Sequence, residues 1–535
     1  MKENKLNLDQ KLMLEHQKSI DSIIINILVG IVALIPLLTR AAIIQHISPV
    51  IGDPVLGSGM KADVFTYYKF VFLVIGAVLL LVFFLYKMLG HGYTIQSSYI
   101  NLPTGALFLL IAISAITSYY KMLSLFGQYN RHDGVITYLC YLVLFFISAS
   151  VMYSEKKLKL LFYAMYPAII INAVLGLLYF YGADLLNYSF IRAIILPSDI
   201  PQSAIKGGSA FNSTINNPNY VSGISSVFIT IFLVKALFAS SKIDKAISLL
   251  ISILSFAMLL TSLSTSGFLT FVVLIPLVLF LIIAGVKPGP AFITFFVAIV
   301  AYFGVFTLLN EHNPSVWTNT IGFFMGQKAD GENIESKKVY EKANGHTVKT
   351  VDFLAQNSPF IPEKVYAAEG KQIKDEFDLP QPGWAAGTGR VYIWEKTFEL
   401  IKKRPLLGYG LDTLAYHFPQ DDPNKISNLH DANVVVDKPH NMYIGLAFGS
   451  GILALIAFLF LMIRHFLHYI SFIRNRIVYE KEKILAALFT GWCAYLIQAF
   501  FNDSIIGTAP IFWILFGVSV AVLRQEKESI DELRA

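Results

Sequence analysis

The stretch FLTFVVLIPLVLFLIIAGV, residues 268–286, contains no charged residue and decides the fold class. A bilayer core of about 30 Å takes about 20 apolar residues in a helix that rises roughly 1.5 Å per residue, so this stretch can cross a membrane. Backbone groups in lipid must pair within their own helix or within a closed barrel, which predicts a helix here. Comparable apolar runs recur from residue 23 to residue 523.

The composition agrees with a chain that lies mostly in lipid. Of the 535 residues, 55% are hydrophobic and 15% are charged, against about 25% charged residues in a typical soluble protein. The apolar runs predict an all-α integral membrane protein with about twelve transmembrane helices. The predicted spans are approximately 23–38, 67–86, 102–117, 135–153, 158–181, 220–238, 243–263, 268–286, 291–309, 442–464, 484–501 and 505–523.

The basic residues predict the orientation of these spans. Lysines and arginines gather in loops that would share one side of the membrane, at 156–159, 242–245, 464–483 and 524–527. Such residues mark the cytoplasmic side, so both termini are predicted to be cytoplasmic in a plasma-membrane protein. The chain then divides into spans one to nine (1–309), one large, partly helical extracytoplasmic loop (310–439), and spans ten to twelve with a cytoplasmic tail (440–535).

Several classes of function find no support in the sequence. The net charge of +6 is scattered over short loops and forms no basic stripe with interleaved aromatic residues, so no nucleic-acid partner is predicted. Cys140 and Cys493 lie inside apolar runs, where they are expected to behave as small hydrophobic residues. There is no Asp-x-Asp pair of the kind that holds a metal in nucleotide-sugar enzymes, and we predict neither a metal nor a cofactor.

The large loop contains the segment RVYIWEKTFELIKKRPLLGYG, which begins at Arg390. Val391, Trp394, Phe398 and Ile401 are spaced to lie on one face of a helix, and Pro405 ends it. Gly408-Tyr409-Gly410 then predicts a turn. Trp394 is interpreted as a core residue in the first place, with a sugar-stacking platform as the alternative.

Arg390 is unusual because a cation in the first turn of a helix faces the positive end of the helix dipole. An anion held by Arg390 and by the unpaired N–H groups of that helix end would remove the conflict. The alternative is a solvated arginine or a salt bridge with Glu395 or Asp378.

The loop returns to the membrane at Asp437-Lys438-Pro439-His440-Asn441. Proline and asparagine are ordinary residues at a helix start, whereas a histidine is required for neither purpose. The positive end of the helix favours a neutral imidazole, which can accept a proton. The alternative is an interfacial histidine that reaches to water.

The segments TGRVYIWEKTFELIKKRPLLGYG and DKPHNMYIGLAFGSG resemble the signature of the O-antigen ligase and polymerase family. Upstream, FGQYNRHDGVITYL and TINNPNYVSG resemble two further segments of this family. One departure stands at residues 264–267, Ser-Thr-Ser-Gly, where many members carry an arginine. Arg131, Lys206 or Arg40 could supply the missing cation.

The resemblance implies a membrane glycosyltransferase that takes its glycan from an undecaprenyl diphosphate-linked donor, without a metal ion. The acceptor is a hydroxyl of a glycan, lipid or protein outside the cytoplasm, and the displacement inverts the anomeric carbon. The implied catalytic residues are His440 as the base and Arg390 as a diphosphate contact. The implied substrate-binding residues are Arg131, Lys206, Asn219, Trp394 and Asn441.

Three alternatives remain open. A polymerase would extend a lipid-linked chain instead of handing it to another acceptor. A transporter or flippase for lipid-linked sugars would share the number of spans, although it should place charged or helix-breaking residues at mid-membrane in paired halves. The loop could also serve only to bind partner proteins.

Overall fold

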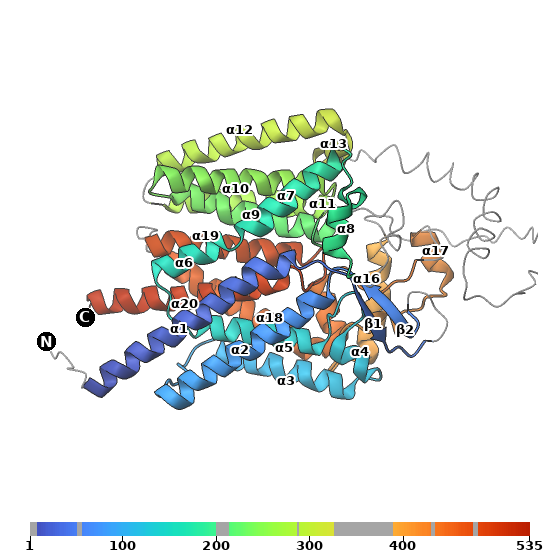
Figure 1. The fold of residues 1–535 in the computed structure, drawn as a ribbon, viewed down its shortest axis with the longest axis horizontal. Coiled ribbons are helices and arrows are strands. Elements are labelled where there is room, and N and C mark those ends of the chain that lie inside the picture. The colour runs from blue at the N-terminus through green and yellow to red at the C-terminus, as the bar shows by residue number, and fades with distance from the viewer. Residues whose placement is uncertain are drawn as a thin grey trace, which may run out of the picture.

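The computed structural model describes residues 8–50, 56–198, 213–285, 288–325, 389–429, 434–473 and 480–534. They form a bundle of long helices with a smaller cap at one end (Figure 1). The main helices are α1 (Leu8–Leu34), α2 (Tyr67–His91), α3 (Asn101–Thr117), α5 (Val135–Ala149), α6 (Glu155–Tyr163), α7 (Tyr166–Phe180), α9 (Pro218–Phe238), α10 (Lys242–Thr261), α11 (Thr265–Ala284), α12 (Pro288–His312), α18 (Met442–Ile473), α19 (Glu480–Gln498) and α20 (Ala509–Arg534).

The prediction of a helical, multi-pass membrane protein is confirmed. Within the described residues, nine helical segments are long and apolar enough to cross a membrane, and three shorter apolar helices accompany them. The three shorter helices are Asn101–Thr117, Val135–Ala149 and Lys483–Gln498. Each of the twelve predicted spans overlaps one of these segments, while the number that cross the membrane stays a prediction.

Short elements join the long helices and build the cap. They are η1 (Ile35–Leu37), α4 (Lys121–Phe126), η2 (Leu185–Asn187), α8 (Ser189–Ile195), α13 (Ser315–Thr318), α14 (Ile321–Phe324), α16 (Arg390–Lys403), η4 (Leu414–Tyr416) and α17 (Pro423–Leu429). The start of α1 and the end of α20 lie at one end of the bundle, and α16 and α17 lie at the other (Figure 1). The side of the membrane on which each end lies stays a prediction.

The cap also contains a β-hairpin that the all-α prediction missed. Strand β1 (Ala42–His46) pairs antiparallel with β2 (Gly59–Asp63), so that Ala42 faces Asp63 and His46 faces Gly59. Each strand has five residues, which is too short for a two-residue alternation to stand out from an ordinary loop.

Helix α16 confirms the helix predicted within the large loop. It runs from Arg390 to Lys403, and its buried residues are Tyr392, Ile393, Thr397 and Ile401. Phe398, which was predicted on the apolar face, is 48% exposed. The buried face is therefore rotated from the predicted one, because Tyr392 and Ile393 pack against the start of α18 and the turns around it.

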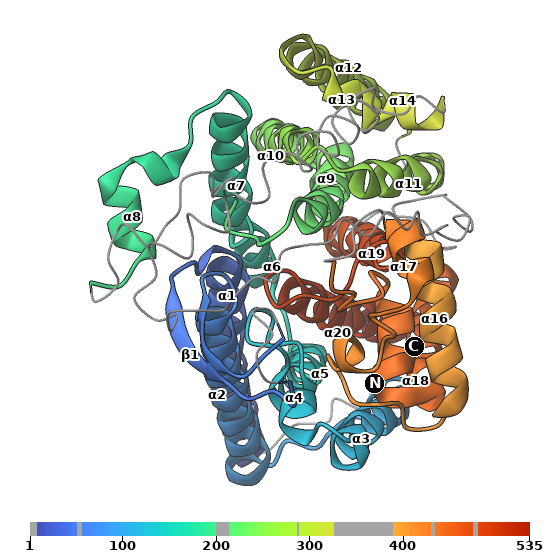
Figure 2. The ribbon, with the colours of Figure 1, turned by 90° about the vertical axis from the view of Figure 1, so that its right-hand side faces the viewer.

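A break in α18 fixes the loop to the membrane bundle. Gly451 has φ 87° inside this helix, a left-handed value that suits glycine. The turn after α16 takes up the backbone groups left unpaired there, because Ile452 N donates to Pro405 O at 2.7 Å and Tyr409 N donates to Phe448 O at 2.9 Å. Figure 2 shows α16 lying along α18 when the cap faces the viewer. The predicted turn around Tyr409 is thus confirmed, and it joins the loop to α18.

Candidate functional site

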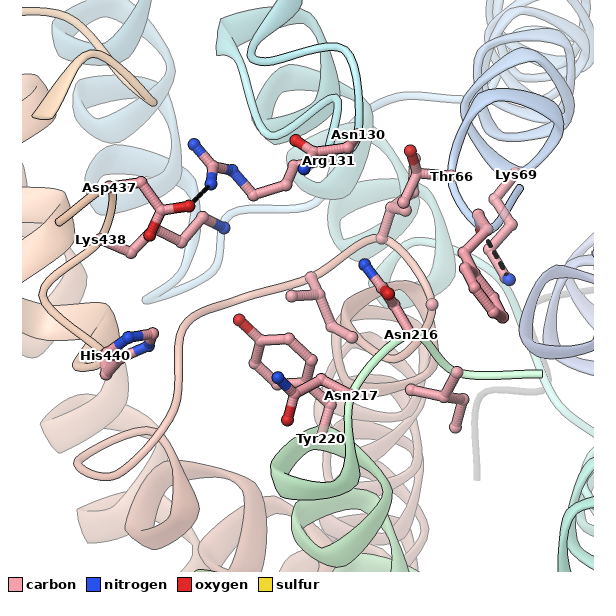
Figure 3. Close-up of a pocket in the computed structure, with 15 residues that line it drawn as sticks. Thr66, Lys69, Asn130, Arg131, Asn216, Asn217, Tyr220, Asp437, Lys438 and His440 are labelled. Atoms are coloured by element: carbon pink, nitrogen blue, oxygen red, sulfur yellow. Dashed lines mark hydrogen bonds and ion pairs between the residues drawn. The ribbon is translucent and has the colours of Figure 1, made fainter. Parts of the chain in front are cut away.

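A cavity of about 230 Å³ opens at the capped end of the bundle, where helices α2, α9 and α18 begin. Its lining includes Thr66, Lys69, Arg131, Tyr220 and His440. Figure 3 shows these side chains arranged around one space. Because three helices start beside the cavity, their positive dipole ends face the same region, which favours negative charge there.

His440 and Asp503 form a paired acid and imidazole at this cavity. His440 Nδ1 lies 3.0 Å from Asp503 Oδ2, and the two side chains are 42% and 7% exposed. An ionised carboxylate only accepts hydrogen bonds, so Nδ1 carries the hydrogen and Nε2 can accept a proton. The hydroxyl of Tyr220 donates to the same carboxylate oxygen at 3.4 Å. Asp503 therefore fixes the orientation of the His440 ring.

The surroundings of Asp503 keep it ionised. Burial alone would raise the pKa of Asp503, but the hydrogen bond and charge of His440 and the charges of Lys438 and Arg131 outweigh burial. The result is a pKa of about 2. The carboxylate therefore remains charged at neutral pH and can stabilise a protonated imidazole.

The backbone on both sides of His440 is held in place by two predicted site residues. His440 has φ 51°, a value uncommon for residues other than glycine and often found at functional sites. Trp394 Nε1 donates to Pro439 O at 2.7 Å. Asn441 Oδ1 accepts from the backbone N–H groups of residues 443 and 444, at 3.0 and 3.1 Å, and so caps α18. Trp394 and Asn441 thus flank His440 and position it.

Arg390 stands at the start of α16 without a carboxylate partner among the described residues. It is half-buried; burial lowers the pKa of its guanidinium, while the nearby charge of Asp503 opposes that shift. Glu395, one predicted alternative partner, makes no ion pair with it in this part of the structure, and Asp378 lies outside the described residues. Arg390 is therefore a cation close to the His440 and Asp503 pair.

Arg131 differs from Arg390 because two carboxylates neutralise it. Its Nη2 lies 2.8 Å from Asp412 Oδ1, and its Nη1 forms an ion pair with Asp437. Burial would lower the pKa of Arg131, but these two carboxylates raise it above the usual value. Arg131, whose role in substrate binding stays a prediction, lines the cavity, and its charge is compensated by Asp412 and Asp437.

A second buried ion pair stands beside Arg131. Lys438 Nζ lies 2.6 Å from Asp133 Oδ2, and both side chains are almost fully buried. Burial raises the pKa of Asp133 to about 6, and the charge of Lys438 opposes this rise. Together the two pairs fix the segment before His440 to the loop that precedes α5.

The remaining predicted residues do not line the cavity or lie outside the described chain. Asn219 Oδ1 accepts a hydrogen bond from Ser264 Oγ at 2.7 Å, while its neighbours Asn216 and Asn217 line the cavity. Lys206 lies outside the described residues. Arg40 is exposed on the chain before β1. Asn217, the first residue of the Asn-Pro-Asn segment, and Asn216 before it thus line the cavity, whereas Asn219 does not.

Three residues of the site were not predicted from the sequence: Lys69, Tyr220 and Asp503. Lys69 interrupts an apolar run, and a charged residue in such a run is itself a signal of function. Tyr220 directly follows the Asn-Pro-Asn segment. Asp503 lies between the last two predicted spans, but nothing in its neighbourhood along the chain links it to His440.

The chain matches the family model described as O-antigen ligase over residues 250–459, which is less than half of its length. The matched range contains Arg390, Trp394 and His440, whereas Lys69 and Asp503 lie outside it. No curated protein matches the chain in sequence. The match supports a glycosyltransferase-like function in glycan assembly at the membrane. It confirms the resemblance drawn from the sequence motifs: residues 250–459 are similar to the O-antigen ligase family.

Proposed function

We propose that this protein transfers a glycan from an undecaprenyl diphosphate-linked donor to an acceptor hydroxyl on the extracytoplasmic side, with inversion and without a metal ion. The observation that carries the proposal is the pairing of His440 with the ionised Asp503 at a cavity, with Arg390, which forms no ion pair among the described residues, close to Asp503. This combination offers a base for the acceptor and a cation for the leaving diphosphate.

The proposed step is a single displacement. Nε2 of His440 takes the proton of the acceptor hydroxyl, and the acceptor oxygen forms a bond to the anomeric carbon. The bond between that carbon and the diphosphate oxygen breaks, and its electron pair leaves with the lipid diphosphate. Arg390 stabilises the negative charge that develops on the diphosphate, and Asp503 stabilises the imidazolium that forms.

The function is tested with purified protein in vesicles that contain an undecaprenyl diphosphate-linked glycan and a hydroxyl-bearing acceptor, with a chelator present. We expect the glycan to appear on the acceptor and undecaprenyl diphosphate to be released in equal amount. Growth of the lipid-linked chain itself would select the polymerase alternative. Movement of the intact donor across the vesicle membrane without release of lipid diphosphate would contradict the proposal and select a transporter.

The variant Asp503→Asn tests the pairing. An amide can donate to Nδ1 and so favour the tautomer with hydrogen on Nε2, which cannot accept a proton. We expect the transfer rate to fall by about 10²–10⁴-fold, the range of general-base catalysis. Asp421→Asn, at an exposed position, serves as the matched control. A rate for Asp503→Asn within a few-fold of the control would remove Asp503 from the mechanism.

The orientation of the large loop is tested by thiol labelling in intact cells. In a variant with Cys140 and Cys493 replaced by alanine, we expect a cysteine at Lys371 to react with an impermeant reagent and one at Lys481 not to react. The reason is the bias of basic residues toward the cytoplasm. Both positions have side chains outside the described part of the structure. Labelling at both positions, or only at Lys481, would contradict the predicted topology.

A further inference from the structure

Lys69 is a buried cation on the wall of the cavity. It is 1% exposed and stands in the first turn of α2, where a positive charge faces the positive end of the helix dipole. Its Nζ donates to Phe65 O at 2.7 Å and to Thr214 O at 2.9 Å. An ammonium has three N–H donors, so within the described ranges these two carbonyls leave one donor available.

No carboxylate makes an ion pair with Lys69 among the described residues. The negative charge of Asp63 attracts Lys69, but hydrogen-bond donors at the start of α2 already bind the Asp63 carboxylate. It accepts from Phe65 N at 3.2 Å, from Thr66 N at 2.9 Å and from Thr66 Oγ1 at 2.9 Å. A buried charge is costly unless it is paired, and no residue in the described part of the chain supplies the anion.

The position of Lys69 relative to His440 indicates where that anion would come from. Both residues line the same cavity, and Figure 3 shows them on opposite sides of it, with Tyr220 and Asn216 between them. A substrate that presents its reacting carbon to His440 and fills the cavity therefore reaches Lys69. Arg131 also lines the cavity, but Asp412 and Asp437 already neutralise it.

We propose that Lys69 binds an anionic group of the glycan donor at the side of the cavity opposite His440. This inference rests on the proposed function. The anion is a phosphate of the lipid diphosphate or an acidic group of the glycan, since both offer the charged oxygens that an ammonium binds.

Two substitutions separate charge from structure. Lys69→Gln keeps N–H donors for the carbonyls of Phe65 and Thr214 but removes the charge, whereas Lys69→Met removes both. Lys121→Gln, at an exposed position in α4 at the same end of the bundle, is the matched control. Binding is measured on the purified full chain with three probes: undecaprenyl diphosphate alone, a donor with a neutral glycan, and a donor with an acidic glycan.

We expect Lys69→Gln and Lys69→Met to bind at least one probe about tenfold more weakly or worse, the range of one charge-assisted hydrogen bond. The apparent KM for the donor should rise more than kcat falls. Weaker binding of undecaprenyl diphosphate alone places the diphosphate at Lys69. A loss confined to the donor with an acidic glycan places the glycan there.

The proposal is overturned if Lys69→Gln binds all three probes as tightly as the control, because the role of Lys69 would then be to donate hydrogen bonds to the carbonyls of Phe65 and Thr214. Failure of the proposed function gives a different result, because the wild-type protein would then release no lipid diphosphate from the donor, whether or not it binds the probes. A thermal unfolding measurement on each variant shows whether weaker binding accompanies a loss of folding.

Discussion

Replacing His440 by alanine is expected to lower the transfer rate by about 10²–10⁴-fold and to leave binding of the lipid donor unchanged. The imidazole is held by Asp503 at 3.0 Å, so its loss removes the acceptor of the proton. The diphosphate is assigned to cations elsewhere, which is why the affinity for the donor should persist. The rate and the donor affinity are measured separately on the purified variant.

His417→Ala provides the comparison for His440. His417 packs between the rings of Tyr120 and Tyr409, at 5.1 and 4.5 Å between centroids, and does not line the cavity. Burial lowers the pKa of His417 to about 4, and we expect this variant to lose little activity. A His440→Ala rate within a few-fold of wild type would remove the base from the mechanism, and lost donor binding would move His440 to the diphosphate site.

Arg390→Ala is expected to abolish transfer, and Arg390→Lys to be weakly active at best. Arginine offers a planar fork of donors that matches two phosphate oxygens, whereas lysine retains the charge without the fork. Because Arg390 has no carboxylate partner among the described residues, its removal should leave no unpaired carboxylate behind. The amount of protein in the membrane should therefore stay unchanged for both variants.

Lys403→Ala is the matched control for Arg390, since it removes an exposed cation from the other end of the same helix. Lysine and arginine near a helix C-terminus interact favourably with the dipole and need no further function. Full activity of Arg390→Ala, measured per amount of folded protein, would show that Arg390 is a solvated arginine without a role in transfer. The diphosphate would then be bound by other cations.

The sequence predicts the membrane helices because each apolar run carries its own signal. Residues 268–286 require a helix in lipid whatever their neighbours are. The break of α18 at Gly451 could not be predicted, because the groups that pair with it come from the turn at Pro405. The hairpin of β1 and β2 was missed for a similar reason, since two five-residue strands gain their identity by pairing with each other.

The site shows the same contrast between local and long-range signals. His440 and Arg390 stand in motifs that can be recognised along the chain, one at a helix start and one at a loop helix. Asp503 lies 63 residues from His440, and only the fold brings the two together. Arg131 was predicted as an available cation, but its neutralisation depends on Asp412 and Asp437, which lie 281 and 306 residues away.

The proposed mechanism is a single displacement at the anomeric carbon, with His440 as the base and no metal ion. It is tested by the anomeric configuration of the transferred sugar, determined by NMR on product made by the purified protein in the presence of a chelator. We expect a product whose configuration is opposite to that of the lipid-linked donor. A product with retained configuration would contradict it, because retention requires a second displacement at the same carbon.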